Sequence, residues 1–105
     1  MSRDLHPTDG ARYLLERDAD HGERALYRAT VFTPTESFAT VLTLVDNGDV
    51  VVADGAEALA EPHHAALMMF AKLTARGAAK RREAELPAWP GRVLRWRGPG
   101  RGGSV

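Results

Sequence analysis

The only cluster of side chains suited to metal ligation or acid–base chemistry is the adjacent pair His63 and His64, with Glu57 and Glu61 just before it. Neighbouring residues on a helix point about 100° apart, so two adjacent imidazoles do not naturally share one metal ion. Zinc-binding helices instead place their histidines four residues apart, and Met68 occupies that position after His64. We therefore predict no metal site, no cofactor and no catalytic residue, and we interpret both histidines as neutral surface side chains.

Two further kinds of chemistry lack the residues they need. The chain has no cysteine, which excludes disulfides, thiolate metal sites and thiol nucleophiles. Its C-terminal glycines precede no helix, whereas a phosphate-binding loop delivers its ligand to a helix N-terminus. We therefore expect that the chain is not an enzyme, and we rank a small metal-dependent or hydrolytic enzyme around His63, His64 and Asp54 as the third hypothesis.

The C-terminal third of the chain combines positive charge with aromatic rings. Residues 1–70 carry a net charge of −7 and residues 71–105 a net charge of +7, although the whole chain is neutral. Trp89 and Trp96 lie among these cations, a composition typical of surfaces that bind single-stranded nucleic acid. The candidate nucleic-acid-binding residues are Arg81, Arg82, Arg92, Arg95, Arg97 and Arg101.

The same charges have a structural explanation. Basic residues are favoured at the C-terminal end of a helix by the helix dipole. Alternation along residues 92–97 would turn Trp96 toward the core while Arg95 and Arg97 face solvent. Zero net charge also differs from the strongly basic character of most nucleic-acid-binding domains. Nucleic-acid binding is therefore the alternative function and not the preferred one.

The first half of the chain has the periodicity of strands. Residues 11–17, 23–33, 37–45 and 50–53 are rich in apolar and β-branched residues, and the segment 18–22 between the first two is predicted as a loop. In the second strand the set that alternates toward the core is Ala25, Tyr27, Ala29 and Val31. Asn47-Gly48 predicts a hairpin with a two-residue type I′ turn, which requires positive φ angles.

After residue 56 the composition changes to that of a helix. We predict that the helix begins at Glu61 or Pro62, because proline is favoured at the first helical position. Gly77 either interrupts this helix or lets it pack closely on the sheet. Residues 92–97 alternate again and predict a fifth strand that returns to the sheet. The residues whose spacing predicts the buried helix face are Ala66, Met69, Phe70, Leu73 and Gly77.

The predicted fold is therefore α+β, an antiparallel β-meander of four strands followed by one main α-helix and a fifth strand. Residues 1–97 form a single domain, and residues 98–105 a flexible Gly-rich tail. The longest apolar stretch has seven residues where about 20 are needed to span a membrane. No signal peptide is visible. We expect a cytoplasmic protein that does not bind membranes, and the many Arg and Ala residues favour a bacterial source with a GC-rich genome.

A single helix leaves one face of such a sheet uncovered. Residues 23–33 and 37–45 are apolar on both faces, as in strands that are covered on both sides. Met68 and Met69 supply flexible side chains suited to adaptable contacts. The preferred function is therefore a non-enzymatic binding or protein-interaction module, whose partner is another protein or a second copy in a homodimer.

Overall fold

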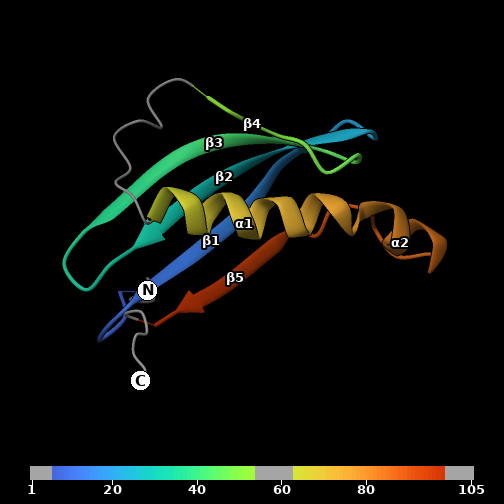
Figure 1. The fold of residues 1–105 in the computed structure, drawn as a ribbon. Coiled ribbons are helices and arrows are strands. Elements are labelled where there is room, and N and C mark those ends of the chain that lie inside the picture. Colours follow the sequence, from blue (N-terminus) through green and yellow to red (C-terminus); the bar gives the residue numbers. More distant parts are fainter. Residues whose placement is uncertain (1–5, 54–62, 99–105) are drawn as a thin grey trace.

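The computed structural model describes residues 6–53 and 63–98, and these form an antiparallel sheet with two consecutive helices on one face (Figure 1). The spatial order of the five strands is β4-β3-β2-β1-β5. The fifth strand pairs with the first, which confirms the predicted α+β meander and the return of the chain to the sheet. The elements are β1 (Ala11–Asp20), β2 (Arg24–Phe32), β3 (Ser37–Val45), β4 (Val50–Val52), α1 (His63–Arg76), α2 (Ala78–Glu83) and β5 (Arg92–Arg97).

Several predicted features lie outside the described residues. These are the helix start at Glu61 or Pro62, the tail from residue 99 onward, and the side chains of Asp54, Glu57 and Arg101.

The core lies between the sheet and α1. All four residues predicted to face inward from β2 are buried, which confirms the alternation of that strand. Their cross-strand neighbours Leu15, Leu42 and Leu44 are buried on the same face, because partners in an antiparallel register point to the same side. Trp89, from the connection between α2 and β5, completes this core.

The helix presents a different face to the sheet from the one predicted. Met69 and Leu73 are 41% and 55% exposed, so their placement in the core was wrong. The buried stripe is shifted by about one residue, roughly 100° around the helix. Most of the side chains in this stripe are small. Small side chains let the helix backbone approach the bulky rings of Tyr13 and Tyr27 on the sheet. The buried residues of α1 are Ala66, Leu67, Ala71, Thr74 and Ala75.

Gly77 lies between α1 and α2 without ending the helical hydrogen bonding. Its amide donates to the carbonyl of Leu73 at 3.2 Å, and its own carbonyl accepts from the amide of Arg81 at 3.0 Å. A Cβ at this position would lie 2.6 Å from Nη1 of Arg81. The close approach that Gly77 permits is therefore to the side chain of Arg81.

β1 is longer than predicted and contains a bulge. Residues 18–20 were expected in a loop, but they extend β1 to Asp20. The register with β2 shifts between Arg17 and Ala19, so one extra residue is accommodated within the strand. The turn that follows is held by the Asp20 side chain, whose Oδ1 accepts a hydrogen bond from the amide of Gly22 at 2.9 Å. The turn-forming residues are therefore partly used to bend a strand.

The β3–β4 hairpin forms where Asn47-Gly48 predicted it, but with a different turn. The amide of Gly48 donates to the carbonyl of Val45 at 2.8 Å, and the amide of Val45 donates to the carbonyl of Asp49 at 2.9 Å. Gly48 has a φ of 100°, whereas Asn47 is not among the described residues with positive φ. The loop thus has three residues, a turn followed by a glycine bulge, instead of the two-residue type I′ turn.

The glycine of this hairpin should be sensitive to substitution. We expect Gly48→Ala to lower the free energy of unfolding by about 1–2 kcal/mol, because alanine is strained at positive φ. The added Cβ would also lie 3.1 Å from Cγ of Arg76. Urea denaturation followed by tryptophan fluorescence measures this loss.

Gly91→Ala is the matched control, since Gly91 is not among the positive-φ glycines and a Cβ there would meet nothing within 4 Å. Its stability should stay within about 0.5 kcal/mol of the wild type. Equal losses in the two variants would contradict the described hairpin.

Candidate functional site

Trp89 closes one end of the space between the sheet and the helices. It is fully buried, and its indole Nε1 donates to the carbonyl of Gly22 at 2.8 Å. The hydroxyl of Tyr27 donates to the carbonyl of Pro90 at 2.7 Å, and Nη1 of Arg17 donates to the carbonyl of Trp89 at 2.7 Å. Burial raises the pKa of Tyr27 to about 12, although nearby arginine charges act against it. At this end of the core, main-chain carbonyls therefore accept hydrogen bonds from two neutral side chains, Tyr27 and Trp89, and from the cationic side chain of Arg17.

Two of the candidate nucleic-acid-binding arginines are engaged within the fold. Arg81 donates from Nε to the carbonyl of Ala88 at 2.7 Å and from Nη2 to the carbonyl of Thr74 at 2.5 Å. Arg82 forms an ion pair with Asp46, with 2.9 Å between Nη1 and Oδ2. Arg81 thus fastens the α2–β5 connection to α1, and Arg82 fastens α2 to the β3–β4 hairpin.

The remaining described candidates lie on β5, which is an edge strand of the sheet. Arg92, Arg95 and Arg97 are all exposed. Nη1 of Arg95 donates to the carbonyl of its neighbour Leu94 at 3.0 Å. The structure therefore brings three of the six candidates together on one strand and places Arg81 and Arg82 in structural contacts elsewhere.

The structure buries Trp89 and exposes Trp96. Trp96 was predicted to face the core, but it is 54% exposed, and its Nε1 donates to the carbonyl of Asp9 at 3.0 Å. The core position on β5 belongs to Val93, which pairs with the buried Leu15. The prediction was wrong because alternation divides a strand into two sets without showing which set is covered.

No described helix or strand covers the second face of the sheet, on the side away from α1 (Figure 1). Val41 and Val51 on this face are 40% and 58% exposed. We call this surface the open face. Its apolar residues larger than alanine, contributed by all five strands, are Leu14, Leu26, Phe32, Val41, Val45, Val51, Leu94 and Trp96.

Charged residues interrupt the open face in two rows. In the first row the register places Glu16 between Arg28 and Arg92. In the second row Arg12 lies between two aromatic residues, Phe32 and Trp96. The open face is therefore a mixture of apolar patches, aromatic rings and mainly positive charge.

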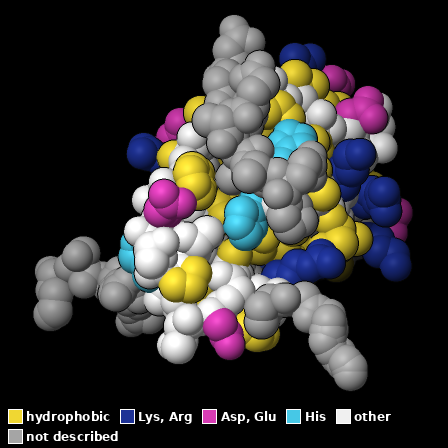
Figure 2. All heavy atoms as spheres, turned by 60° about the vertical axis from the view of Figure 1, so that its left-hand side comes forward, with side chains coloured by type: hydrophobic (Ala, Val, Ile, Leu, Met, Phe, Trp, Pro, Cys, Tyr) yellow, Lys and Arg dark blue, Asp and Glu magenta, His cyan; other side chains and the backbone are white. Residues whose placement is uncertain are grey.

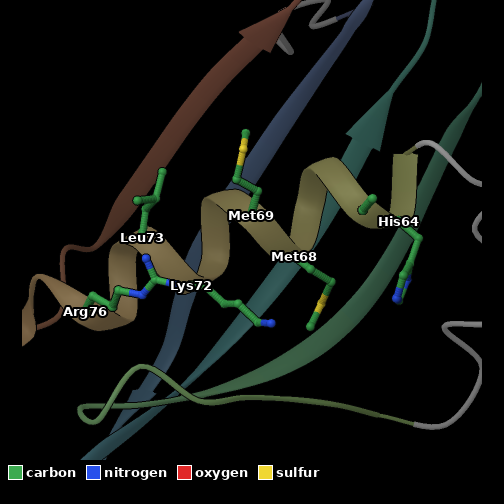
Figure 3. A pocket seen from close by; sticks show the side chains of 7 residues that line it. His64, Met68, Met69, Lys72, Leu73 and Arg76 are labelled. Atoms are coloured by element: carbon green, nitrogen blue, oxygen red, sulfur yellow. The ribbon is translucent and has the colours of Figure 1, made fainter.

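The two histidines point to different sides of α1. His63 faces the sheet, where its Nδ1 lies 3.2 Å from the hydroxyl of Tyr13. Burial raises the pKa of Tyr13, and the positive charge of Arg97 partly opposes this shift. His64 lies on the outer side of the helix (Figure 3). Within residues 6–53 and 63–98, no three His, Asp or Glu side chains come close enough together to hold a metal ion.

Sequence reasoning missed the residues of the open face outside β5. The available signal was the presence of apolar residues on both sides of residues 37–45, which predicted two covered faces without indicating the exposed one. It also missed that charge gathers in space: Lys and Arg side chains cluster toward one side of the molecule, with hydrophobic side chains between them (Figure 2). The candidate sites are therefore surfaces and not a cleft with converging catalytic groups.

The structural role of Arg81 can be separated from a ligand-binding role. We expect Arg81→Met to lower the free energy of unfolding by about 1–3 kcal/mol, because it removes two hydrogen bonds from a charged donor. Lys80→Met is the control. It removes the same charge from an exposed neighbour and should change stability by less than about 0.5 kcal/mol. Thermal and urea unfolding measure both, and an Arg81→Met protein as stable as the control would contradict the structural role.

Within the described residues, no helix is both long and apolar enough to cross a membrane. Comparisons with protein-family models, with curated proteins and with solved structures found no match. The surfaces described above are therefore the basis on which a function can be argued.

Proposed function

We propose that this chain is a non-enzymatic protein-interaction module that binds through the open face of its sheet. The observation that carries the proposal is the exposure of large apolar side chains on a face that no described element covers. Val41, Val51 and Trp96 contribute from three different strands, two of them at the sheet edges. Apolar side chains that gather on one uncovered face are typical of an interaction surface, whereas single exposed apolar residues are ordinary.

The composition of the open face supports this assignment. An antiparallel sheet with one face in water usually alternates apolar and polar residues along each strand. Here Leu14 is buried on the outer side as well, where the register places it between Leu94 and Thr30. The open face therefore combines apolar patches with rows of charge, and protein interfaces likewise combine apolar and polar contacts.

A second copy of the chain is the simplest occupant. Two-fold dimers are the commonest oligomers, and two sheets can pack face to face. The row in which Glu16 lies between Arg28 and Arg92 supplies both signs of charge. In a two-fold pair, Glu16 of one copy can therefore meet an arginine of the other.

Self-association is tested by sedimentation over a wide range of concentrations. We expect a dimer that dissociates on dilution, and we expect Val51→Glu to shift the protein to monomer, because it places a charge in an apolar interface. Leu73→Glu is the matched control, since Leu73 is almost equally exposed but lies on α1, on the other side of the sheet. A monomer at every concentration, or a dimer unaffected by Val51→Glu, would remove the homodimer.

Single-stranded nucleic acid is the second candidate, favoured by one observation on the same face. The register places Arg12 between Phe32 and Trp96, so a cation and two rings lie side by side at the surface. Bases stack on exposed aromatic rings while arginines meet the phosphates. Arg92 adds exposed positive charge on this face, while Arg95 and Arg97 are exposed on the other side of the same edge strand.

Fluorescence anisotropy with a labelled single-stranded oligonucleotide tests this candidate. Binding should weaken between about 50 and 200 mM salt, because phosphate contacts release counterions. Trp96→Ala should weaken it about tenfold, in line with the loss of one stacked base. Lys80→Ala, which removes an exposed cation away from β5, should have little effect. Absence of binding at the lower salt concentration would eliminate the candidate.

A further inference from the structure

A shallow groove runs along the outer side of α1, facing away from the sheet and thus away from the open face (Figure 3). The side chains that line it form two rows with i, i+4 spacing. Met68, Lys72 and Arg76 belong to one row, and Met69 and Leu73 belong to the other. Met68 and Lys72 of the first row point toward the side of the β3–β4 hairpin, while Met69 and Leu73 point to the opposite side.

This geometry is that of a helix-packing surface. Rows of residues four apart form ridges on a helix, and the groove between two ridges accepts a ridge from another helix. The most exposed apolar side chains of α1, Met69 and Leu73, flank this groove. Methionine adapts its shape to different partners. The two ridges on the outer side of α1 therefore leave a groove between them into which a ridge of another helix can pack.

Among the described residues that line the groove, Lys72 and Arg76 are positively charged and none is acidic. His64 lies at one end of the groove, Lys72 in the middle and Arg76 at the other end, and α1 contains no acidic residue. Across the described ranges 6–53 and 63–98, the side chains of Lys72 and Arg76 make no ion pair or hydrogen bond. This contrasts with Arg81 and Arg82, which are committed to partners within the fold. The groove therefore presents apolar contacts beside two uncommitted cations.

We propose that this groove binds an acidic amphipathic helix of a partner protein. The apolar stripe of that helix packs against Met69 and Leu73, and its carboxylates meet Lys72 and Arg76. Helix-in-groove recognition of this kind uses apolar anchors for affinity and charge for orientation. This site is separate from the open face and goes beyond the proposed function.

The charge of the groove also decides between occupants. A second copy bound symmetrically through the same groove would bring Lys72 and Arg76 of both copies into one contact, because a two-fold interface joins the same surface patch of each copy. Like charges at such a contact are unfavourable. A partner whose helix carries carboxylates on the flanks of its apolar stripe satisfies both the groove and its cations.

The experiment uses a fluorescently labelled synthetic helix with leucine along one stripe and glutamate on both flanks. We expect the full-length protein to bind this peptide, as measured by anisotropy. The double variant Lys72→Glu/Arg76→Glu should bind it at least tenfold more weakly, because two ion pairs become two repulsions. A second peptide, with lysine in place of glutamate, should then prefer the double variant over the wild type. This reversal separates a specific groove from a loss of folding.

The matched control is Arg24→Glu/Lys80→Glu, which changes the net charge by the same amount at two exposed positions outside the groove. It should bind the acidic peptide within about twofold of the wild type. Val51→Glu on the open face should likewise leave peptide binding unchanged, so the two surfaces can fail independently. Circular dichroism and thermal unfolding of each variant confirm that it is folded.

Three results would overturn the proposal. The first is no binding of the acidic peptide by the wild type. The second is equal weakening by the control pair, which would mean that charge acts without the groove. The third is binding to vesicles of phosphatidylcholine and phosphatidylserine that depends on Lys72 and Arg76 in the absence of peptide binding, which would assign the groove to an anionic lipid surface.

Discussion

β4 and β5 lie at opposite edges of the sheet, so the chain that joins them must cross the full width of one face. α1 lies obliquely on this face: His63 at its start contacts Tyr13 of β1, and Arg76 at its end lies beside Gly48 of the β3–β4 hairpin. The helix therefore covers the sheet between β1 and β4, and the described residues contain no second long helix. This arrangement covers one face of the sheet and leaves the other open.

The core between the sheet and the helices must also be covered at the end where the chain turns from α2 into β5. A connection that passes over the end of a core brings main-chain carbonyls close to apolar side chains, and buried carbonyls need donors. Trp89, Tyr27, Arg17 and Arg81 supply these donors, each from a different element or connection. One of the cations that follow α1 in the sequence, Arg81, is therefore used to satisfy main-chain carbonyls within the fold.

Much of this architecture could be predicted from the sequence, because it rests on local chemistry. Alternation identified the buried set of β2, and Asn47-Gly48 identified the hairpin. The turn itself was predicted less well, since its loop length depends on the register of β3 with β4 and not on the two residues alone. The fifth strand was predicted from a six-residue alternation. The prediction is confirmed because β5 pairs with the free edge of β1.

The candidate surfaces could not be predicted in the same way. Periodicity divides a strand or helix into faces, but the choice of the covered face depends on what packs against it. Trp96 was expected to be inside because it alternates with Arg95 and Arg97, yet the alternating set of β5 that faces the core is the one that contains Val93. Similarly, spacing along α1 predicted Met69 and Leu73 in the core, but the buried stripe consists mainly of alanines together with Leu67, and it packs against rings from the sheet.

The outer side of α1 carries apolar side chains that the packing of the core does not require. The core between helix and sheet includes the rings of Tyr13, Tyr27 and Trp89, and the inner stripe of the helix contributes three alanines together with Leu67 and Thr74. Two longer apolar side chains, Met69 and Leu73, lie on the outer stripe. A helix needing only to cover the sheet would carry polar residues there, as surface helices normally do. That Met69 and Leu73 occupy these positions, beside cations without partners in the described fold, is therefore not a consequence of folding and is the strongest reason to look for a helix that binds them.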